Sequence, residues 1–374
     1  MDNLKEFTIK NKKMIFPVYF PDATRGVIRS LDSQDIRQAK IEGVIVNTYH
    51  LLSQPGTTVI KEFGGIKNYM DWDGWAISDS GGFQLLSLVY KNKGFGKISK
   101  DGIIFYRGSR GQKKKHYFTP EKSIQTQFTL NTDIIICLDD CPAVNAKEKE
   151  IDISVERTIL WAKRCKEEFQ KQIEIRKLSE VNRPLLLAVI QGGNDKQKRK
   201  YCAQKLIEIG FDAYGFGGWP MDEAGNFNHE IVGYTASLMP PELPKFALGV
   251  GNPKAIIEGF KSGYNIFDCV LPTRDARHRR LYCFAKDPDK IDILNDKNIF
   301  EYLYINREKY VRDQSPISNY CDCHACRNYS RGYLSHLFEI EESLAWRLAT
   351  IHNLRTYSKL IELLRNTLSR GQQT

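Results

Sequence analysis

The sequence lacks any hydrophobic run long enough to cross a membrane. Its longest apolar run extends only from Leu185 to Ile190, whereas a membrane-spanning helix needs about 20 apolar residues. The first residues, MDNLKEFTIKNKK, contain no apolar segment of the kind found in secretion signals. We therefore expect a cytoplasmic protein with no membrane partner.

The cysteine content also argues against a disulfide scaffold. Nine cysteines cannot all pair with one another, and a reducing compartment keeps thiols free. Three of them, Cys321, Cys323 and Cys326, fall within six residues, and no cysteine follows them. We expect the following four to be buried small apolar residues: Cys137, Cys165, Cys202 and Cys283.

The three clustered cysteines predict a metal site. They can present three thiolates from one loop to a tetrahedral ion, and Zn²⁺ is the usual occupant of sulfur-rich sites that contain one imidazole. The fourth ligand must then be a histidine: His324 lies between the cysteines, and His336 and His352 follow them. His352 lies in a predicted helical segment, so its use would tie the loop to that helix. A site filled by four protein ligands is structural; free or redox-active thiols are the alternative.

Positive charge is in excess and is clustered. The formal net charge is +10, and basic residues gather at Lys113 to Lys115, Lys196 to Lys200 and Arg274 to Arg280. Such clusters favour a polyanionic partner, because each neutralised phosphate releases condensed counterions. A solvated basic surface without a partner is the alternative.

Short apolar runs alternate with segments of helical period. Eight such runs predict eight buried parallel strands, and that number favours a closed (β/α)8 barrel, an α/β fold. Two helices are expected to start with a cap followed by proline, at Thr119 and Asn252. We expect a catalytic barrel over residues 1–283 and a zinc-binding appendage with C-terminal helices over residues 284–374. The predicted strands lie within 14–20, 43–50, 75–80, 133–139, 185–193, 213–218, 245–251 and 265–271.

Polar and glycine residues follow most of these strands. A barrel collects the carboxyl ends of its strands at one mouth, where barrel active sites are built. A single aspartate there is often only a helix cap, but several carboxylates and a glutamine on one rim indicate an active site. The residues concerned are Asp79, Gly81, Gly82, Asp139, Asp140, Gln191, Gly192, Gly193, Gly217, Gly218, Gly249, Gly251 and Asp268.

Several longer motifs resemble those of the tRNA-guanine transglycosylase family. The resemblance extends from about residue 8 to the C-terminus in the order of the family. It implies the same barrel and zinc appendage, a homodimer formed in part through the zinc region, and exchange of a guanine in tRNA for a 7-deazaguanine base. The motifs are NTYHLLSQPG (47–56), SDSGGFQLLSL (78–88), FTPEKSIQTQ (118–127), LDDCP (138–142), IQGG (190–193), GVGNP (249–253), FDCVLPTRDAR (267–277) and CDCHACRNYSRGYLSHL (321–337).

The resemblance also implies roles for individual residues. Asp268 matches the nucleophile that attacks C1′ of the ribose, and Asp79 matches the general acid and base. Asp139 matches the acceptor for the N1 and N2 edge of the purine, whereas Gln191 and the backbone amide of Gly218 match donors to its O6.

Further positions match the family at the edges of the site. Phe83 matches the ring that stacks on the base, Leu248 occupies the facing apolar position, and Gly217 and Cys141 belong to the same base-binding motifs. Arg274 and Arg277 match arginines that hold the tRNA anticodon loop. The ligand set implied for Zn²⁺ is Cys321, Cys323, Cys326 and His352.

Two segments depart from the usual bacterial pattern. GGWPMDE, residues 217–223, stands where bacterial members usually read GGLAVGE. Trp219 and Pro220 fall where the family backbone meets the 7-substituent of the incoming base, and proline has no N–H to donate. RHRR, residues 277–280, replaces an arginine followed by Asn-Gly. The incoming base is thus open between 7-aminomethyl-7-deazaguanine, known as preQ1, and queuine.

Two other functions remain open from the sequence. A related transglycosylase that inserts a deazaguanine into DNA is one, because the bulky basic pair His278 and Arg279 could alter nucleic-acid contacts. A non-catalytic tRNA-binding partner subunit is the other, and the presence of both Asp79 and Asp268 argues against it.

Overall fold

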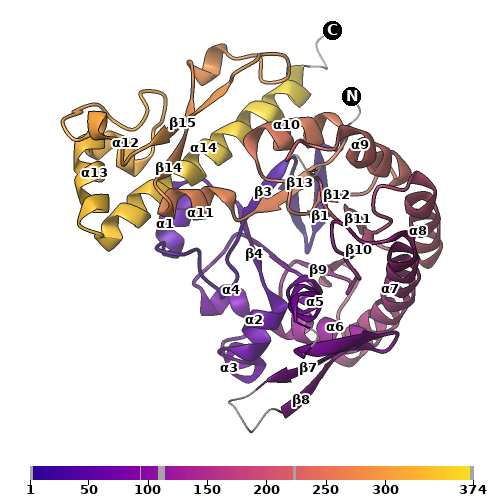
Figure 1. Cartoon of the computed structure of the whole chain (residues 1–374). Coiled ribbons are helices and arrows are strands. Elements are labelled where there is room, and N and C mark those ends of the chain that lie inside the picture. The colour runs from indigo at the N-terminus through magenta and orange to yellow at the C-terminus, as the bar shows by residue number, and fades with distance from the viewer. Residues whose placement is uncertain (1–2, 93, 108–113, 222–224, 371–374) are drawn as a thin grey trace.

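A parallel sheet of eight strands forms the centre of the computed structural model, which describes residues 3–92, 94–107, 114–221 and 225–370 (Figure 1). The strand order is β3-β13-β12-β11-β10-β9-β5-β4. A parallel bridge between Asp22 and Ile45, with Ala23 N–H donating to the Ile45 carbonyl at 2.8 Å, joins the two ends. The strands are β3 (Val18–Pro21), β4 (Gly43–Val46), β5 (Trp75–Ser78), β9 (Ile134–Ile136), β10 (Leu185–Ile190), β11 (Ala213–Phe216), β12 (Lys245–Ala247) and β13 (Ile266–Cys269).

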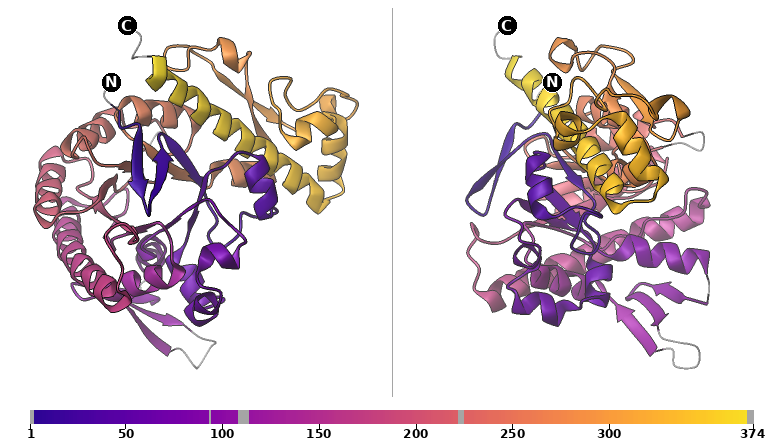
Figure 2. Two further views of the ribbon diagram at one scale, coloured as in Figure 1. Left: turned by 180° about the vertical axis from the view of Figure 1, so that it is seen from behind. Right: turned by 90° about the vertical axis from the view of Figure 1, so that its left-hand side faces the viewer.

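The barrel interior is packed with alternate side chains of its strands. In β10, Leu185, Leu187 and Val189 belong to the inner cluster, whereas Leu186, Ala188 and Ile190 belong to the cluster between strands and helices. This division follows from the two-residue period of a strand, and it explains why β10 is apolar throughout. The hairpin of β1 (Glu6–Ile9) and β2 (Lys12–Ile15) covers the amino-terminal end of the barrel, as the view from behind shows (Figure 2).

Helices surround the barrel. The cap and proline pairs predicted from the sequence are confirmed: the Thr119 side chain accepts from Lys122 N–H before Pro120, and the Asn252 side chain accepts from Lys254 N–H before Pro253. The surrounding helices are α1 (Ser33–Gln38), α2 (Thr48–Ser53), α3 (Thr57–Glu62), α4 (Ile66–Tyr69), α5 (Gly82–Lys91), α6 (Pro120–Leu130), α7 (Glu148–Arg176), α8 (Lys196–Ile209), α9 (His229–Leu238), α10 (Pro253–Lys261), α11 (Leu271–Arg277) and α14 (Ser343–Arg370).

The eight predicted strands are confirmed, each shorter than its apolar run, and in two runs the cause is plain. The run 14–20 is divided into β2 and β3, because Pro17 lies between them and has no N–H for a strand ladder. The run 43–50 stops at Val46, where Asn47 caps α2 by accepting a hydrogen bond from His50 N–H.

Elements after β13 form a lobe beside the barrel, and α14 runs from this lobe back along the barrel (Figures 1 and 2). In it, β14 (Arg280–Phe284) pairs with β15 (Phe300–Tyr304), and Pro288–Lys290 and Glu308–Tyr310 are 3₁₀ turns. The predicted helical segment that contains His352 is α14, which the chain enters from α13 (Arg331–Glu339) near Glu341, a residue with a φ of +55°. The short helix α12 (His324–Asn328) follows the cysteines.

A three-stranded antiparallel sheet interrupts the connection between α5 and α6. It consists of β6 (Gly96–Ser99), β7 (Gly102–Arg107) and β8 (Lys114–Phe118). Lys113, which the sequence placed in a basic cluster, lies outside the described residues, as do Asp222 and Glu223 of the GGWPMDE segment. Within the described part of the chain, every helix is too short or too polar to span a membrane.

Candidate active site and metal centre

Asp79 lies directly after β5, at the carboxyl end of the barrel. Its Oδ1 accepts hydrogen bonds from the backbone N–H groups of Thr48 (2.9 Å) and Gly81 (3.0 Å), and its Oδ2 accepts one from Asn47 Nδ2 (2.6 Å). Burial nevertheless raises the pKa of Asp79 to about 7, and the negative charge of Asp268 adds to the rise. The carboxyl group is thus oriented by three donors and titrates near neutral pH, as a general acid and base requires.

Asp268 is the third residue of β13 and lies on the same rim. Its Oδ1 accepts a hydrogen bond from Gly249 N–H at 2.8 Å, and Gly249 has a φ of +72°, which glycine adopts without strain. Burial raises the pKa of Asp268 to about 7, with a smaller contribution from the charge of Asp22. Asp268 has only one hydrogen bond among the described contacts of its carboxylate, so its other oxygen is available to attack an electrophile.

Asp139 and Gln191 meet across neighbouring strands β9 and β10. Gln191 Nε2 donates to Asp139 Oδ2 at 2.7 Å, and the same side chain lies within hydrogen-bond reach of the Cys141 thiol. Burial raises the pKa of Asp139 to about 6, against the lowering effect of the Gln191 hydrogen bond. Gln191 Oε1 is buried and has no hydrogen-bond partner. Such a group is costly unless a ligand or water completes it.

Two glycines adjoin this pair. A Cβ on Gly217 would lie 2.4 Å from Gln191 Nε2, so only glycine permits the glutamine to lie where it does. Gly218 has a φ of +105°, which again favours glycine. The sequence grouped both with the base-binding residues, and the structure brings both against Gln191.

Aromatic and apolar groups line the side of the site. Phe83, at the start of α5, is 46% exposed and meets Trp219 edge-on, with 5.9 Å between the ring centroids. Trp219 Nε1 donates to the Pro142 carbonyl at 3.1 Å. Cys141 is buried, and burial together with the charge of Asp139 raises the pKa of its thiol to about 12. A cavity of about 500 Å³ extends past Gln191, Gly218, Trp219 and Met221.

Leu248 and the two predicted arginines lie on the same rim. Leu248 directly follows β12 and packs partly buried against the inner core. Arg274 and Arg277 lie on α11, which begins three residues after Asp268. Arg277 donates to the Thr273 carbonyl at 2.8 Å, and burial and the nearby Arg29 lower its pKa.

Several residues without an assigned role in the sequence surround this site. Asn47 and Thr48 orient Asp79, and Gly249, identified from the sequence only as a rim glycine, orients Asp268; the first two were visible within the NTYH motif. Arg199 is buried and donates to the carbonyls of Gly193 (2.7 Å), Ile190 (3.2 Å) and Gly217 (2.9 Å). It thereby fixes the loops after β10 and β11, although its place in a run of lysines suggested an exposed basic residue. The negative charge of Asp22 contributes to the raised pKa of both Asp79 and Asp268.

The predicted metal ligands converge. Ligand atoms of Cys321, Cys323, Cys326 and His352 all lie within 4.8 Å of one another. His352 is fully buried on α14, its Nδ1 lies 3.2 Å from Cys326 Sγ, and its Nε2 lies 2.9 Å from the Tyr282 carbonyl. A proton on Nε2 leaves Nδ1 free for a metal, and the carbonyl orients the ring.

The other two histidines lie outside this cluster. His324 contacts Asn328 on the exposed side of α12, and His336 is exposed on α13. All four other cysteines expected to be buried are buried. The cluster therefore could hold a metal ion that joins the cysteine loop to α14, and the hydrogen bond to Tyr282 extends this connection to β14.

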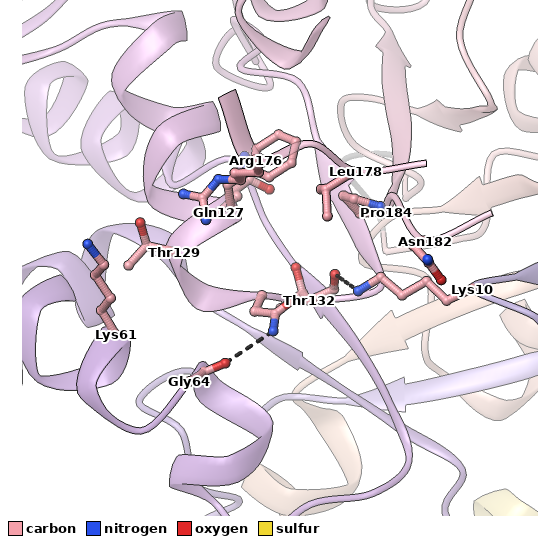
Figure 3. Close-up of a pocket in the computed structure, with 12 residues that line it drawn as sticks. Lys10, Lys61, Gly64, Gln127, Thr129, Thr132, Arg176, Leu178, Asn182 and Pro184 are labelled. Carbon is pink, nitrogen blue, oxygen red and sulfur yellow. Dashed lines mark hydrogen bonds between the residues drawn. The ribbon is translucent and has the colours of Figure 1, made fainter. Parts of the chain in front are cut away.

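A second hollow lies at the opposite end of the barrel (Figure 3). It has a volume of about 290 Å³, and Lys10, Lys61 and Arg176 contribute to its wall. Lys10 Nζ donates to the Thr132 carbonyl at 3.0 Å, and Asn131 Nδ2 donates to the Gly64 carbonyl at 3.1 Å. Thr132 and Pro184 precede β9 and β10, so this hollow is at the amino ends of the strands, which in barrels of this type contribute to stability and not to catalysis.

Comparison with known proteins agrees with this geometry. The family model described as queuine tRNA-ribosyltransferase matches residues 3–374. A queuine tRNA-ribosyltransferase of Caldanaerobacter subterraneus subsp. tengcongensis is 36% identical over 352 residues, covering 94% of this chain and 86% of the relative. Proteins of the same name from Methylacidiphilum infernorum (36% over 356 residues; 95% and 89% covered) and Staphylococcus haemolyticus (36% over 355 residues; 94% and 85% covered) are equally similar.

Proposed function

This chain belongs to the queuine tRNA-ribosyltransferase family and is a tRNA-guanine transglycosylase, and we propose that Asp268 and Asp79 carry out its reaction. The single observation that carries the proposal is that two partly buried carboxylates, each with a pKa of about 7, lie on one rim, where the charge of Asp268 contributes to the raised pKa of Asp79. The relatives do not favour insertion into DNA or a non-catalytic role.

The first step forms a covalent intermediate. An Asp268 oxygen attacks C1′ of the target nucleoside, and the bond from C1′ to N9 of guanine breaks with its electrons going to the base. Asp79, in its protonated form, gives a proton to the departing guanine. A carboxylate nucleophile divides one difficult displacement into two easier ones.

The second step reverses the roles. Asp79, now ionised, removes the proton from N9 of the incoming 7-deazaguanine, which attacks C1′ and expels Asp268. The ribose keeps its original configuration after two inversions. A pKa near 7 lets Asp79 give and accept this proton at neutral pH.

The base is recognised by Asp139 and Gln191, which follow β9 and β10. Asp139 accepts from the N1 and N2 groups of guanine, and Gln191 Nε2 together with Gly218 N–H donates to O6, in place of their contacts with the Cys141 thiol. Phe83 stacks on the exchanged base and Leu248 lies on its other side.

Extruding a base from a single-stranded loop costs less than from a duplex, which favours the anticodon loop, held by Arg274 and Arg277. Trp219 and Pro220 adjoin the position of the 7-substituent, whether the base is preQ1 or queuine.

The metal in this proposal is Zn²⁺, held by Cys321, Cys323, Cys326 and His352. Three thiols and one imidazole are a donor set that suits zinc, and four protein ligands leave no position for a substrate. The ion stabilises the appendage, which we take to comprise residues 284–374 beside a catalytic barrel of residues 1–283.

Exposed Tyr333, Ile340 and Trp346 on this lobe support a homodimer. A cytoplasmic location is also part of the proposal, because tRNA is modified there.

Exchange of radiolabelled guanine tests the proposal. Wild-type protein should label purified tRNA and leave duplex DNA unlabelled, and Asp268→Asn should abolish labelling while tRNA binding persists. Asp275→Asn is not a suitable control because Asp275 pairs with Arg280; the exposed Asp71→Asn is. Labelling of DNA alone, or full activity of Asp268→Asn, contradicts the proposal.

A further inference from the structure

The three basic clusters of the sequence differ in how many of their cations are paired or buried within the fold. In the second cluster, Lys196 pairs with Glu230, Lys198 pairs with Asp152, and Arg199 is buried. In the third, Arg279 donates to the Phe338 carbonyl and Arg280 pairs with Asp275. These cations are engaged within the protein, which also removes Arg279 as an argument for DNA contact.

The first cluster is different. In the described part of the β6–β8 sheet and its turns there are four lysines, Lys97, Lys100, Lys114 and Lys115, and one acidic residue, Asp101. Among the described residues none of these lysines has a carboxylate within ion-pair distance. Their charge is therefore available to an external anion.

The two faces of this sheet have different chemistry. On the inner face, Phe105 stacks between Phe95 and His116, at 6.0 and 5.2 Å, and meets Tyr49 edge-on. Strand register places Ile104 opposite both Lys97 and Tyr117, and Tyr106 opposite Lys115. Because side chains alternate along a strand, these residues share the outer face.

The outer face exposes aromatic and basic groups together. Tyr117 is 60% exposed and Tyr106 is 41% exposed, and Lys115 Nζ lies over the Tyr117 ring, 4.9 Å from its centroid. Lys97 is exposed on the same face. Aromatic rings on which bases stack, set among lysines that neutralise phosphates, are the chemistry with which proteins bind single-stranded nucleic acid.

The inner face of this sheet packs against the rim and so fixes the outer face relative to it. A Cβ on Gly81 would lie 3.0 Å from the Phe118 ring at the end of β8, and Gly81 N–H is a donor to Asp79. The sheet projects on the side of the barrel opposite the β1–β2 hairpin, away from the zinc lobe (Figures 1 and 2). A nucleic acid with one base at Asp79 would thus pass beside it.

We propose that the outer face of the β6–β8 sheet is a second tRNA-binding surface, which contacts the same tRNA beyond the exchanged nucleotide. Lys97 and Lys115 bind its phosphates, and Tyr106 and Tyr117 pack against an unpaired base or its ribose. The proposal rests on the proposed function, because the occupant of the mouth is taken to be tRNA.

Two double variants test it: Tyr106→Ser/Tyr117→Ser removes the rings, and Lys97→Gln/Lys115→Gln removes the charges. Each should raise KM for tRNA at least about fivefold, given the contribution of one stacked base, with kcat and KM for free guanine unchanged. The charge variant should also lower the slope of log KM against log salt by about 1 to 2. Tyr106→Phe/Tyr117→Phe keeps the rings and should behave as wild type.

The matched control is Tyr201→Ser/Lys205→Gln on α8, where Tyr201 is 42% exposed. It should leave KM for tRNA unchanged. Unchanged KM for tRNA in both sheet variants overturns the proposal, as does an equal loss in the control. A change in sedimentation of the free protein without a change in KM also overturns it, because the face would then be a protein interface.

Direct binding separates this inference from the proposed function. Affinity for fluorescent tRNA is measured with each sheet variant in the Asp268→Asn background, where no exchange occurs. Should wild-type protein fail to exchange guanine, the proposed function has failed, yet weaker tRNA binding by the sheet variants still supports the surface. Equal affinity in that background overturns the surface even where wild-type exchange is normal.

Discussion

The side-chain amide of Gln191 donates a hydrogen bond to the carboxylate of Asp139 over 2.7 Å. This contact joins two neighbouring barrel strands at the mouth, and it fixes the direction of both side chains before a base arrives. In the proposed function, this contact holds the acceptor for the N1 edge of guanine beside a donor to its O6.

Removal of this amide should weaken base binding. In Gln191→Leu we expect KM for guanine to rise about 10- to 100-fold, since a hydrogen bond to a charged group contributes about 1.5–3 kcal/mol. The pKa of Asp139, about 6 with its donor, should rise further without it. As the pH is lowered from 8 to 5, Asp139 becomes protonated and KM for guanine should increase. This increase should begin at a higher pH in the variant than in the wild type. Gln197→Leu, at an exposed position of α8, is the control.

Gly217 should not tolerate a side chain. Gly217→Ala places a methyl group 2.4 Å from Gln191 Nε2, so the glutamine must move and KM for guanine should rise about tenfold or more. Gly233→Ala, where the nearest atom would be 3.7 Å away, should have wild-type kinetics. Steady-state exchange rates over a range of guanine concentrations provide the comparison, and equal KM values in both variants contradict the packing argument.

The rate of exchange should depend on pH in a bell shape. Attack needs ionised Asp268 and departure of guanine needs protonated Asp79, and both groups have a pKa of about 7. The profile of kcat/KM should then be narrow, with its maximum near pH 7; its two limbs belong to the coupled pair. A rate that is flat from pH 5 to 9 argues against this pair of roles. Asp71→Asn, at an exposed position, should keep the wild-type profile.

Neutralising Asp268 should stabilise the folded protein at alkaline pH. The folded-state pKa of Asp268 is raised to about 7, above its ordinary value near 4, so ionisation destabilises the fold progressively as pH rises from about 4 to 7. Asp268→Asn, which retains an acceptor for Gly249 N–H, should gain on the order of 1 kcal/mol at pH 8, after allowance for solvent screening. Thermal unfolding at pH 8 and pH 4 measures it, and the gain should vanish at pH 4.

Loss of one metal ligand should release the ion and loosen the appendage. His352→Ala should lose about one equivalent of zinc and several kcal/mol of stability, because metal binding is coupled to folding. His336→Ala, at an exposed position of α13, should retain both. Metal analysis and thermal unfolding, each with and without a chelator, provide the readouts. A full equivalent of zinc with unchanged stability in His352→Ala means that the fourth ligand has been misassigned.

Much of the fold could be predicted because its signals are local. Eight apolar runs, two cap and proline pairs and three closely spaced cysteines are all visible within short stretches. The division of 14–20 at Pro17 was missed, because the run was taken as a single apolar segment. The pairing of β14 with β15 was missed because a strand partner about 20 residues away leaves no mark on a local pattern.

By itself, the sequence determined the barrel, the family and the residues that belong together at the mouth. The family motifs implied His352 as the fourth metal ligand, and the tertiary structure brings its ring to the three cysteines. The tertiary structure also placed Arg199 in the interior and not on the surface, and it showed that Asn47 and Thr48 orient Asp79 and that Gly249 orients Asp268. These relationships join residues far apart in the chain, and they depend on burial and on hydrogen-bond direction, which exist only once the strands have closed into a barrel.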